Sequence, residues 1–290
     1  SCYFYWFWDL AKYDYQYKKK SISLLLLNAR ITNKSFKKWK IFDSSAKIFF
    51  KKFDVCLSSS LKSNYYLKSL GAKKIRYIGN LKFSQTDKHE DYLNNNILKK
   101  FKSKTVWCAS STHYGEEKIC IDVHKKLKNK YKNLLTVIIP RHIHRTAEII
   151  NATQEIGLKI HIHNSKKIID DKTDIYLVNS FGQTKSFFKV CKTVFLGGSL
   201  IKHGGQNPLE AARYGCKILH GPNIWNFEEI YNLLKRYKVS NKVISTNQLA
   251  YNVDKMLQNK NNSQNLKIKI KDLGNKILNS TLNEINLFIN

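Results

Sequence analysis

Apolar runs of strand length alternate with amphipathic stretches of helix length along most of this 290-residue chain. The runs predict strands at 21–27, 53–59, 75–79, 105–110, 134–140, 174–178, 192–198, 216–219 and 242–245. Helical patterns occupy 115–130, 144–156 and 226–237, and a long amphipathic tail covers 263–288. Fully apolar strands between helices are typical of a parallel sheet covered on both faces. We therefore expect an α/β fold.

A polar stretch at 82–96, KFSQTDKHEDYLNNN, separates two groups of these runs. It predicts a linker, so we expect a first domain at 1–88 and a second at 89–290. The first group has few strands for a complete doubly wound domain.

The chain is strongly basic, with a formal net charge of +30. Such an excess favours an anionic partner: nucleic acid, a phosphorylated lipid or an anionic membrane face. A compositional bias toward Lys, Asn and Ile is the alternative explanation, because it would place Lys on any solvated surface. The basic residues are spread along the chain without an RNA-binding motif, so we expect no nucleic-acid partner. No apolar run reaches the length of a membrane span.

Four predicted loops hold most of the unusual residues, and each follows a predicted strand. They are SSTHYGEE (110–117), PRHIHR (140–145), NSFGQT (179–184) and SLIKHGGQNPLE (199–210). Ligands of open parallel sheets bind at the carboxyl ends of the strands. We therefore expect the four loops to meet at one edge of the sheet.

The last of these loops lies in the segment 194–222, which contains six of the twelve glycines and two of the three prolines. Glycine lets backbone approach a ligand closely. The order N-P-L-E predicts a helix start with Asn207 as N-cap and Pro208 in the first turn, whose N–H groups suit a phosphate. Glu210 would accept hydrogen bonds from a ribose diol. A glycine-rich turn before a capped helix, without a ligand, is the alternative.

The other loops carry weaker signals. Arg141 follows the strand-ending Pro140 and suits forked bonding of a phosphate, or is an ordinary surface arginine. In SSTHYGEE, Glu116 and Glu117 are interpreted equally well as acidic capping residues of a helix or as ligand contacts. His-x-His occurs at 142–144 and 161–163, but no cluster of Cys or carboxylates accompanies either pair, so we expect no metal.

Seven motifs in register resemble the 3-deoxy-D-manno-octulosonic acid (Kdo) transferase family. They are NAR (28–30), GNLKF (79–83), SSTHYGEE (110–117), PRH (140–142), GGSL (197–200), GGQNPLEAA (204–212) and GPNIWNF (221–227). The resemblance runs from about residue 21 to the C-terminus. It implies transfer of Kdo from CMP-Kdo to a lipid A precursor, at the cytoplasmic face of the bacterial inner membrane. It also implies a GT-B fold of two Rossmann-like domains, the first incomplete here, with a C-terminal helix that returns toward the first domain.

The resemblance assigns roles to particular residues and implies neither a metal nor a cofactor. Lys82 would stabilise the transition state by its positive charge. Contacts to the CMP part of the donor are implied for Pro140, Arg141, Phe181, Gly182, Gln183, Asn207, Pro208, Leu209 and Glu210. Further candidates for the cleft are the strand-end residues Thr112, His113, Gly198 and Ser199. The basic surface would suit an anionic membrane, reached peripherally or through an N-terminal anchor absent from this chain.

The chain departs from the family pattern in three places. Two family carboxylates are amides here, at Asn179 and Gln183. The general base, a Glu near the start of the family's first domain, has no counterpart, so we expect a fragment that binds CMP and transfers little sugar. Residues 1–17 contain no Glu and fit a frame-shifted translation. The alternatives are another GT-B nucleotide-sugar transferase and a non-catalytic nucleotide-binding remnant.

Overall fold

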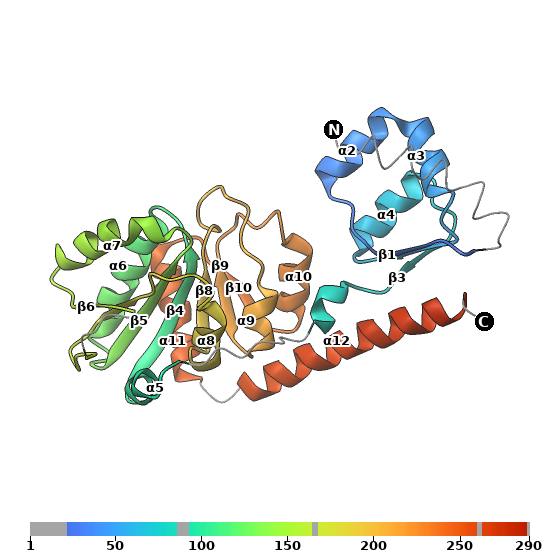
Figure 1. The fold of residues 1–290 in the computed structure, drawn as a ribbon. Coiled ribbons are helices and arrows are strands. Elements are labelled where there is room, and N and C mark those ends of the chain that lie inside the picture. The colour runs from blue at the N-terminus through green and yellow to red at the C-terminus, as the bar shows by residue number, and fades with distance from the viewer. Residues whose placement is uncertain (1–21, 86–92, 164–167, 260–262, 289–290) are drawn as a thin grey trace. The chain divides into compact units, whose positions relative to one another are not determined.

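The computed structural model describes residues 22–85, 93–163, 168–259 and 263–288 (Figure 1). The chain divides into two compact units, of which the first comprises Ser1–Thr86 and Lys271–Asn290 and the second Asp87–Ile270. The stretch 1–17, for which a shifted reading frame is predicted, lies outside the described residues, as does part of the predicted linker, 86–92.

The first unit contains a three-stranded parallel sheet in the order β1-β2-β3. Its elements are β1 (Leu25–Ala29), α2 (Asn33–Ile41), α3 (Asp43–Phe50), β2 (Val55–Ser58), α4 (Leu61–Ser69), β3 (Ile75–Tyr77) and the 3-10 helix η1 (Leu81–Ser84). The basic stretch after β1 forms two helices because Phe42 leaves the helical region, with φ −114° and ψ 51°. Helix α12 (Ser263–Asn286) begins in the range of the second unit and ends in that of the first.

The second unit contains a seven-stranded parallel sheet in the order β10-β9-β8-β4-β5-β7-β6. Its strands are β4 (Thr105–Thr112), β5 (Leu134–Pro140), β6 (Ile160–Ile162), β7 (Ile175–Leu177), β8 (Thr193–Leu196), β9 (Lys217–His220) and β10 (Ser240–Lys242). Its helices are α5 (Asn95–Lys102), α6 (Glu116–Lys128), η2 (Ile143–Arg145), α7 (Thr146–Gln154), α8 (Thr184–Val190), α9 (Leu209–Arg213), α10 (Glu228–Arg236) and α11 (Thr246–Gln258). Strand β4 lies between β5 and β8, so the chain order reverses there, where doubly wound sheets bind ligands.

Helices cover both faces of this larger sheet, as the apolar strands predict (Figure 1). On one face, α6 and α11 pack over Trp107, Ile138 and Ile175 in one buried cluster. On the other, Tyr176 contacts Phe187 of α8 and Phe101 of α5, at ring-centroid distances of 5.8 and 5.1 Å. The α/β fold with parallel sheets is thus confirmed.

Several elements differ from those predicted. Strand β6 was not predicted because it is short and has two histidines in or beside it. Helix α11 was not predicted either, although its buried Leu249, Val253 and Leu257 have helical spacing. Strand β10 lies at Ser240–Lys242 rather than 242–245, although the Val243 N–H still donates to the His220 carbonyl (2.8 Å). Helices η1 and α5 occupy the two ends of the predicted linker, 82–96.

Candidate functional site

A buried carboxylate organises the carboxyl edge of the larger sheet. Glu116, at the start of α6, is fully buried and accepts four backbone N–H groups. Its Oε2 accepts from Gly198 (2.6 Å) and His113 (3.0 Å), and its Oε1 from Ser199 (3.1 Å) and Leu200 (2.9 Å). One side chain therefore fixes the loop after β8 against the end of β4. Neither interpretation of Glu116, as a capping residue or as a ligand contact, predicted that it would bind a second loop.

Glycines make this close packing of loops possible. A Cβ atom at Gly197 would lie 2.5 Å from the Ser111 carbonyl oxygen, and one at Gly221 would lie 2.1 Å from the Ser199 carbonyl oxygen. Neither distance can accommodate a side chain. The Ser199 hydroxyl accepts a hydrogen bond from the Gly221 N–H (2.8 Å) and donates one to the Leu196 carbonyl (2.5 Å). Ser199 is therefore held in place by β8 and by the loop after β9.

The end of β4 bends toward the same point. Ser111 has a left-handed backbone (φ 56°), and the register between β4 and β5 shifts between Ser110 and Thr112. A bulge of this kind at a strand end re-aims the residues that follow, and such strained positions cluster at functional sites. Here they are Thr112 and His113, both buried. The Thr112 carbonyl accepts the Arg141 N–H (2.9 Å), which joins the loops after β4 and β5.

Three histidines from three loops meet at this edge. The His113 ring lies 4.1 Å from that of His203 and 5.4 Å from that of His142, between centroids. Its Nε2 is 3.4 Å from the amide nitrogen of Gln206. Burial, together with the nearby histidines and the cations Arg141 and Arg145, lowers the pKa of His113 to about 4. His113 is therefore neutral near pH 7 and acts as a hydrogen-bonding group rather than as a cation.

The predicted helix start after GGQ is present, with one correction. Helix α9 begins at Leu209 with Pro208 as N-cap, so Asn207 is not the N-cap residue. Its side chain still performs the capping, because the Asn207 Oδ1 accepts the Leu209 N–H (3.2 Å). Proline at the cap position has no side-chain acceptor, which passes that task to the preceding residue. Glu210 lies in the first turn as predicted.

A second group of predicted residues lies where α8 and α9 begin. Gln183 is the N-cap of α8, and Gly182 before it has φ 80°. Phe181 is 72% exposed, so its ring contacts little of the protein and is available for a ligand. The Lys185 ammonium lies 3.9 Å from the Glu210 carboxylate, so the starts of α8 and α9 lie close together.

Arg141 is exposed at the same edge, whereas Arg145 binds other side chains of the protein. Arg145 pairs with Glu117 (2.9 Å) and Glu148 (2.9 Å), and its guanidinium lies 5.1 Å from the centroid of the Tyr114 ring. Of the two glutamates that open α6, Glu116 therefore binds a loop and Glu117 binds an arginine.

Two motifs of the first unit also meet. Asn28 of NAR has a left-handed backbone (φ 49°), and its Oδ1 accepts the Leu81 N–H of GNLKF (3.1 Å). Lys82 is exposed in η1, and its N–H donates to the Asn80 side chain (3.0 Å). A catalytic role for Lys82 stays a prediction.

The histidine pair at 161–163 is part of the packing. The His161 ring stacks 5.3 Å from the Tyr176 ring, and His163 Nδ1 is 2.8 Å from the Tyr176 hydroxyl.

Within the described ranges, no group of three or more His, Cys, Asp or Glu is arranged to hold a metal ion. No helix in the described part of the chain has the length and apolarity needed to cross a bilayer.

Comparison with known proteins gives a consistent family. Residues 12–85 match the family model described as 3-Deoxy-D-manno-octulosonic-acid transferase (kdotransferase). The chain is 29% identical over 280 residues to the 3-deoxy-D-manno-octulosonic acid transferase of Rickettsia bellii, covering 93% of this chain and 66% of that protein. It is 24% identical over 269 residues to the transferase of Haemophilus influenzae, covering 89% and 61%. The chain thus spans less than two thirds of the length of these relatives.

Solved structures share the fold. The C-terminal CMP-Kdo binding domain of WaaA from Acinetobacter baumannii superposes with a TM-score of 0.55 at 23% identity, covering 61% of this chain and 91% of that domain. A putative UDP-N-acetylglucosamine 2-epimerase from Listeria monocytogenes gives a TM-score of 0.53 at 14% identity, covering 94% and 71%. These likenesses agree with the predicted GT-B class. The family model over residues 12–85 and the relatives agree, so this chain is similar to the 3-deoxy-D-manno-octulosonic acid transferases over most of its length.

Proposed function

We propose that this chain carries the donor-binding part of an enzyme that transfers Kdo from CMP-Kdo to a lipid A precursor. The observation that carries the proposal is the carboxyl edge between β4 and β8. There the buried Glu116 carboxylate holds two loops, and glycines let the loops pack closely at the edge where doubly wound sheets bind ligands. The family relationship names the reaction, and the loops supply groups that suit its donor.

Each predicted donor residue has a chemical task in this proposal. Pro140 ends β5 and places the exposed Arg141 at the edge, where its guanidinium would bind the phosphate of CMP through two hydrogen bonds. The segment Asn207–Glu210 would face the ribose, with Glu210 accepting from its hydroxyls. Phe181, Gly182 and Gln183 would contact the cytosine, since an exposed ring can stack on a base.

The strand-end residues would complete the same site. Thr112 and Ser199 are buried supports of its floor, and Gly198 (φ 65°) leaves room for His113. Neutral His113 would offer a hydrogen bond without a charge. Lys82, in the first unit, would stabilise the charge that develops as the glycosidic bond to CMP breaks. The proposal includes no metal and no cofactor.

Titration calorimetry of the 290-residue chain with CMP tests the donor part. We expect saturable binding with a dissociation constant between about 1 μM and 1 mM, and weaker binding of UMP and GMP. Equal affinity for all three nucleotides would favour a general nucleotide-binding remnant. A donor screen with CMP-Kdo, CMP-sialic acid and UDP-sugars then tests whether the amides Asn179 and Gln183 have changed the choice of donor. Absence of any nucleotide binding would refute the proposal.

A radiolabelled transfer assay tests the reaction separately. The resemblance implies a glutamate base that none of these 290 residues matches, so we expect this chain to transfer little or no Kdo even when it binds CMP. Robust turnover by the chain would show that another group acts as the base.

The partner surface proposed for the reaction is an anionic membrane at the inner face of the cell. Ile41 of α2, Phe42 between the helices and Ile48 of α3 are 74%, 57% and 61% exposed. Exposed lysines on the same helices include Lys37 and Lys40. Apolar side chains beside cations are the combination that binds an anionic bilayer surface. Cosedimentation with phosphatidylglycerol vesicles should therefore weaken in Ile41→Ser/Ile48→Ser, whereas Lys125→Gln/Lys126→Gln on α6 should bind as before.

A further inference from the structure

The second unit has a pocket at the opposite edge of its sheet. The pocket has a volume of about 200 Å³ and is lined in part by Lys104, Thr193 and Lys217. Lys104 directly precedes β4, and the other two are the first residues of β8 and β9. The amino ends of three neighbouring strands therefore surround it, whereas the candidate donor site lies beyond their carboxyl ends. Its volume is several times the roughly 30 Å³ that one water occupies.

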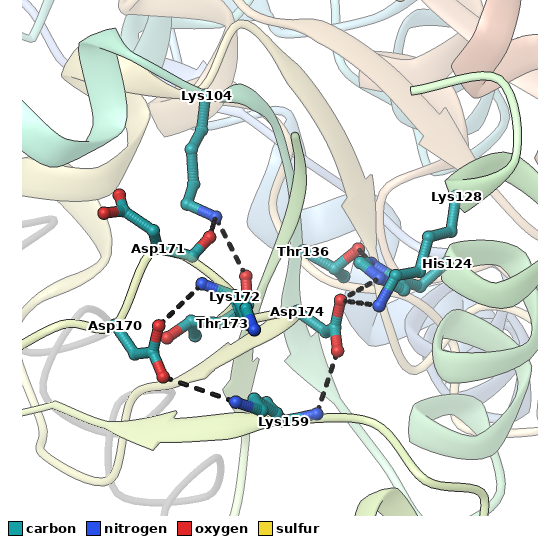
Figure 2. Close-up of polar contacts among 10 residues, drawn as sticks. All are labelled: Lys104, His124, Lys128, Thr136, Lys159, Asp170, Asp171, Lys172, Thr173 and Asp174. Carbon is teal, nitrogen blue, oxygen red and sulfur yellow. Dashed lines mark hydrogen bonds and ion pairs between the residues drawn. The ribbon is translucent and has the colours of Figure 1, made fainter. Parts of the chain in front are cut away.

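Three lysines give this pocket its charge. Lys104, Lys192 and Lys217 line it, and the described residues that line it include no Asp or Glu. Backbone carbonyls hold the ammonium groups in place. Lys104 donates to the carbonyls of Asp171 (2.6 Å) and Thr173 (3.1 Å), as Figure 2 shows. Lys192 donates to those of Phe188 (3.2 Å) and Tyr214 (2.9 Å). Lys217 donates to that of Asn259 (2.7 Å). Carbonyl oxygens position a cation but do not neutralise its charge.

The same three ammonium groups are partly withdrawn from water. Burial lowers the pKa of Lys104, Lys192 and Lys217, because each charged form loses hydration. Nearby cations, Lys100 beside Lys104 and Lys267 beside Lys192, lower it further. Asp171, Asp174 and Asp170 partly offset this charge at Lys104, and the Asp171 carboxylate also pairs with Lys100. An anion in the pocket would relieve the remaining repulsion at Lys104 and Lys192.

Apart from Thr193, Asn259 and Ser263, the remaining lining residues are apolar and include Phe101, Val190 and Met256. A ligand that suits this pocket therefore combines an anionic group with a short apolar one. An ammonium has three N–H donors. The carbonyls named above accept two from Lys104, two from Lys192 and one from Lys217. Each lysine therefore keeps at least one N–H for an anion. Lysine is a common ligand of phosphate, which it binds as a point charge. We propose that this pocket is a second anion site that takes a small soluble monoalkyl phosphate.

The sequence provides a direct probe of this pocket, because Met256 is the only methionine of the chain. Protein labelled with ¹³C-methyl methionine should give one resonance from the pocket, assigned by its loss in Met256→Leu. We expect butyl phosphate to shift it saturably, with a dissociation constant of about 1 mM or below. Inorganic phosphate should bind about tenfold more weakly, because it buries no apolar group. Butan-1-ol, which lacks the charge, should give no saturable shift.

Substitutions separate this pocket from the donor site. Lys104→Gln/Lys217→Gln should bind butyl phosphate at least about tenfold more weakly. Lys125→Gln/Lys126→Gln, which removes the same charge from the exposed face of α6, should bind normally, and so should Arg141→Gln. If the first double variant does not fold, Lys217→Gln alone is measured, with a weakening of about threefold or more. The proposal is overturned if butyl phosphate leaves the Met256 resonance unchanged, if the pocket variants bind as the parent does, or if Arg141→Gln removes the shift.

Discussion

The two edges of the larger sheet are built in opposite ways. At the carboxyl edge, one carboxylate, Glu116, serves backbone N–H groups, and the side chains around it are histidines, hydroxyls and an exposed arginine. At the amino edge, charged side chains pair with each other, as Figure 2 shows. Asp174, before β7, is buried and lies next to Lys128 and His124 of α6. The carboxyl edge leaves polar groups for a ligand, whereas the amino edge at β5, β6 and β7 uses them internally.

A connected network joins α6 to the amino ends of β5, β6 and β7. The His124 Nδ1 is 2.8 Å from the Thr136 hydroxyl, and its Nε2 is 3.4 Å from the Asp174 carboxylate. The other Asp174 oxygen accepts the Lys159 N–H (2.9 Å), which ties the segment before β6 to β7. Burial alone would raise the pKa of Asp174, but hydrogen bonds from His124, Lys128 and the Lys159 backbone outweigh it and lower the pKa. The comparison therefore predicts that substitutions at the carboxyl edge will weaken CMP binding, whereas substitutions in this network will lower stability alone.

The largest effect is expected at Glu116. Glu116→Ala removes the acceptor of four buried N–H groups, each of which costs about 1 kcal/mol or more when left unpaired. We expect a loss of more than about 3 kcal/mol in the free energy of unfolding, together with loss of CMP binding. Urea unfolding measures the first and calorimetry the second. Glu148→Ala, at an exposed glutamate of α7, should cost less than about 1 kcal/mol. A Glu116→Ala protein as stable as Glu148→Ala would show that this carboxylate does not hold the loops.

The next largest effect is expected at Gly221, which packs against the backbone of Ser199. Gly221→Ala would place a methyl group 2.1 Å from the Ser199 carbonyl oxygen, so the loop after β8 must move. We expect a cost of about 2–3 kcal/mol and a measurable weakening of CMP binding. Gly157→Ala is the control, because nothing lies within 4 Å of its Cβ and only its φ of 76° is unfavourable. That strain costs about 1 kcal/mol. Equal melting temperatures for the two variants would contradict the close packing.

Asp174 should have a smaller effect, and only on stability. Asp174→Asn leaves Lys128 without its buried partner, but Lys128 is 40% exposed and can turn to water, so we expect a cost of about 2 kcal/mol at pH 7. The folded-state pKa lies below the ordinary value of 3.8, so the carboxylate stabilises the fold above that value. The difference between the two proteins should therefore shrink as the pH falls below 3.8. CMP binding should not change, and a tenfold loss of affinity would contradict the separation of the edges.

These residues also show how far the sequence could be interpreted. The strand–helix alternation predicted most elements of the second unit, and the loops after β4, β5 and β8 do meet, as Arg141, His113 and Gly198 demonstrate. Periodicity could not show which helix residue faces a distant loop. Glu116 was therefore interpreted only as a first-turn acid or a ligand contact, although three of its four partners lie more than eighty positions later. Asp174 was hidden for the same reason, since nothing near it in the sequence indicates His124. Strand β6 was missed because three residues give too short a pattern.

The smallest effect on stability is expected at Arg141, where the effect on binding should be clear. Its side chain is exposed at the carboxyl edge, so Arg141→Gln should change the free energy of unfolding by less than about 0.5 kcal/mol. Loss of a forked phosphate contact should weaken CMP binding about tenfold or more, while binding of cytidine, which has no phosphate, should not change. Arg236→Gln, an exposed arginine at the end of α10, is the matched control and should leave both affinities unchanged. If Arg141→Gln weakens cytidine and CMP equally, Arg141 contacts the nucleoside instead. If it weakens neither, the carboxyl edge binds its ligand without this arginine, and the phosphate position must be sought nearer α9.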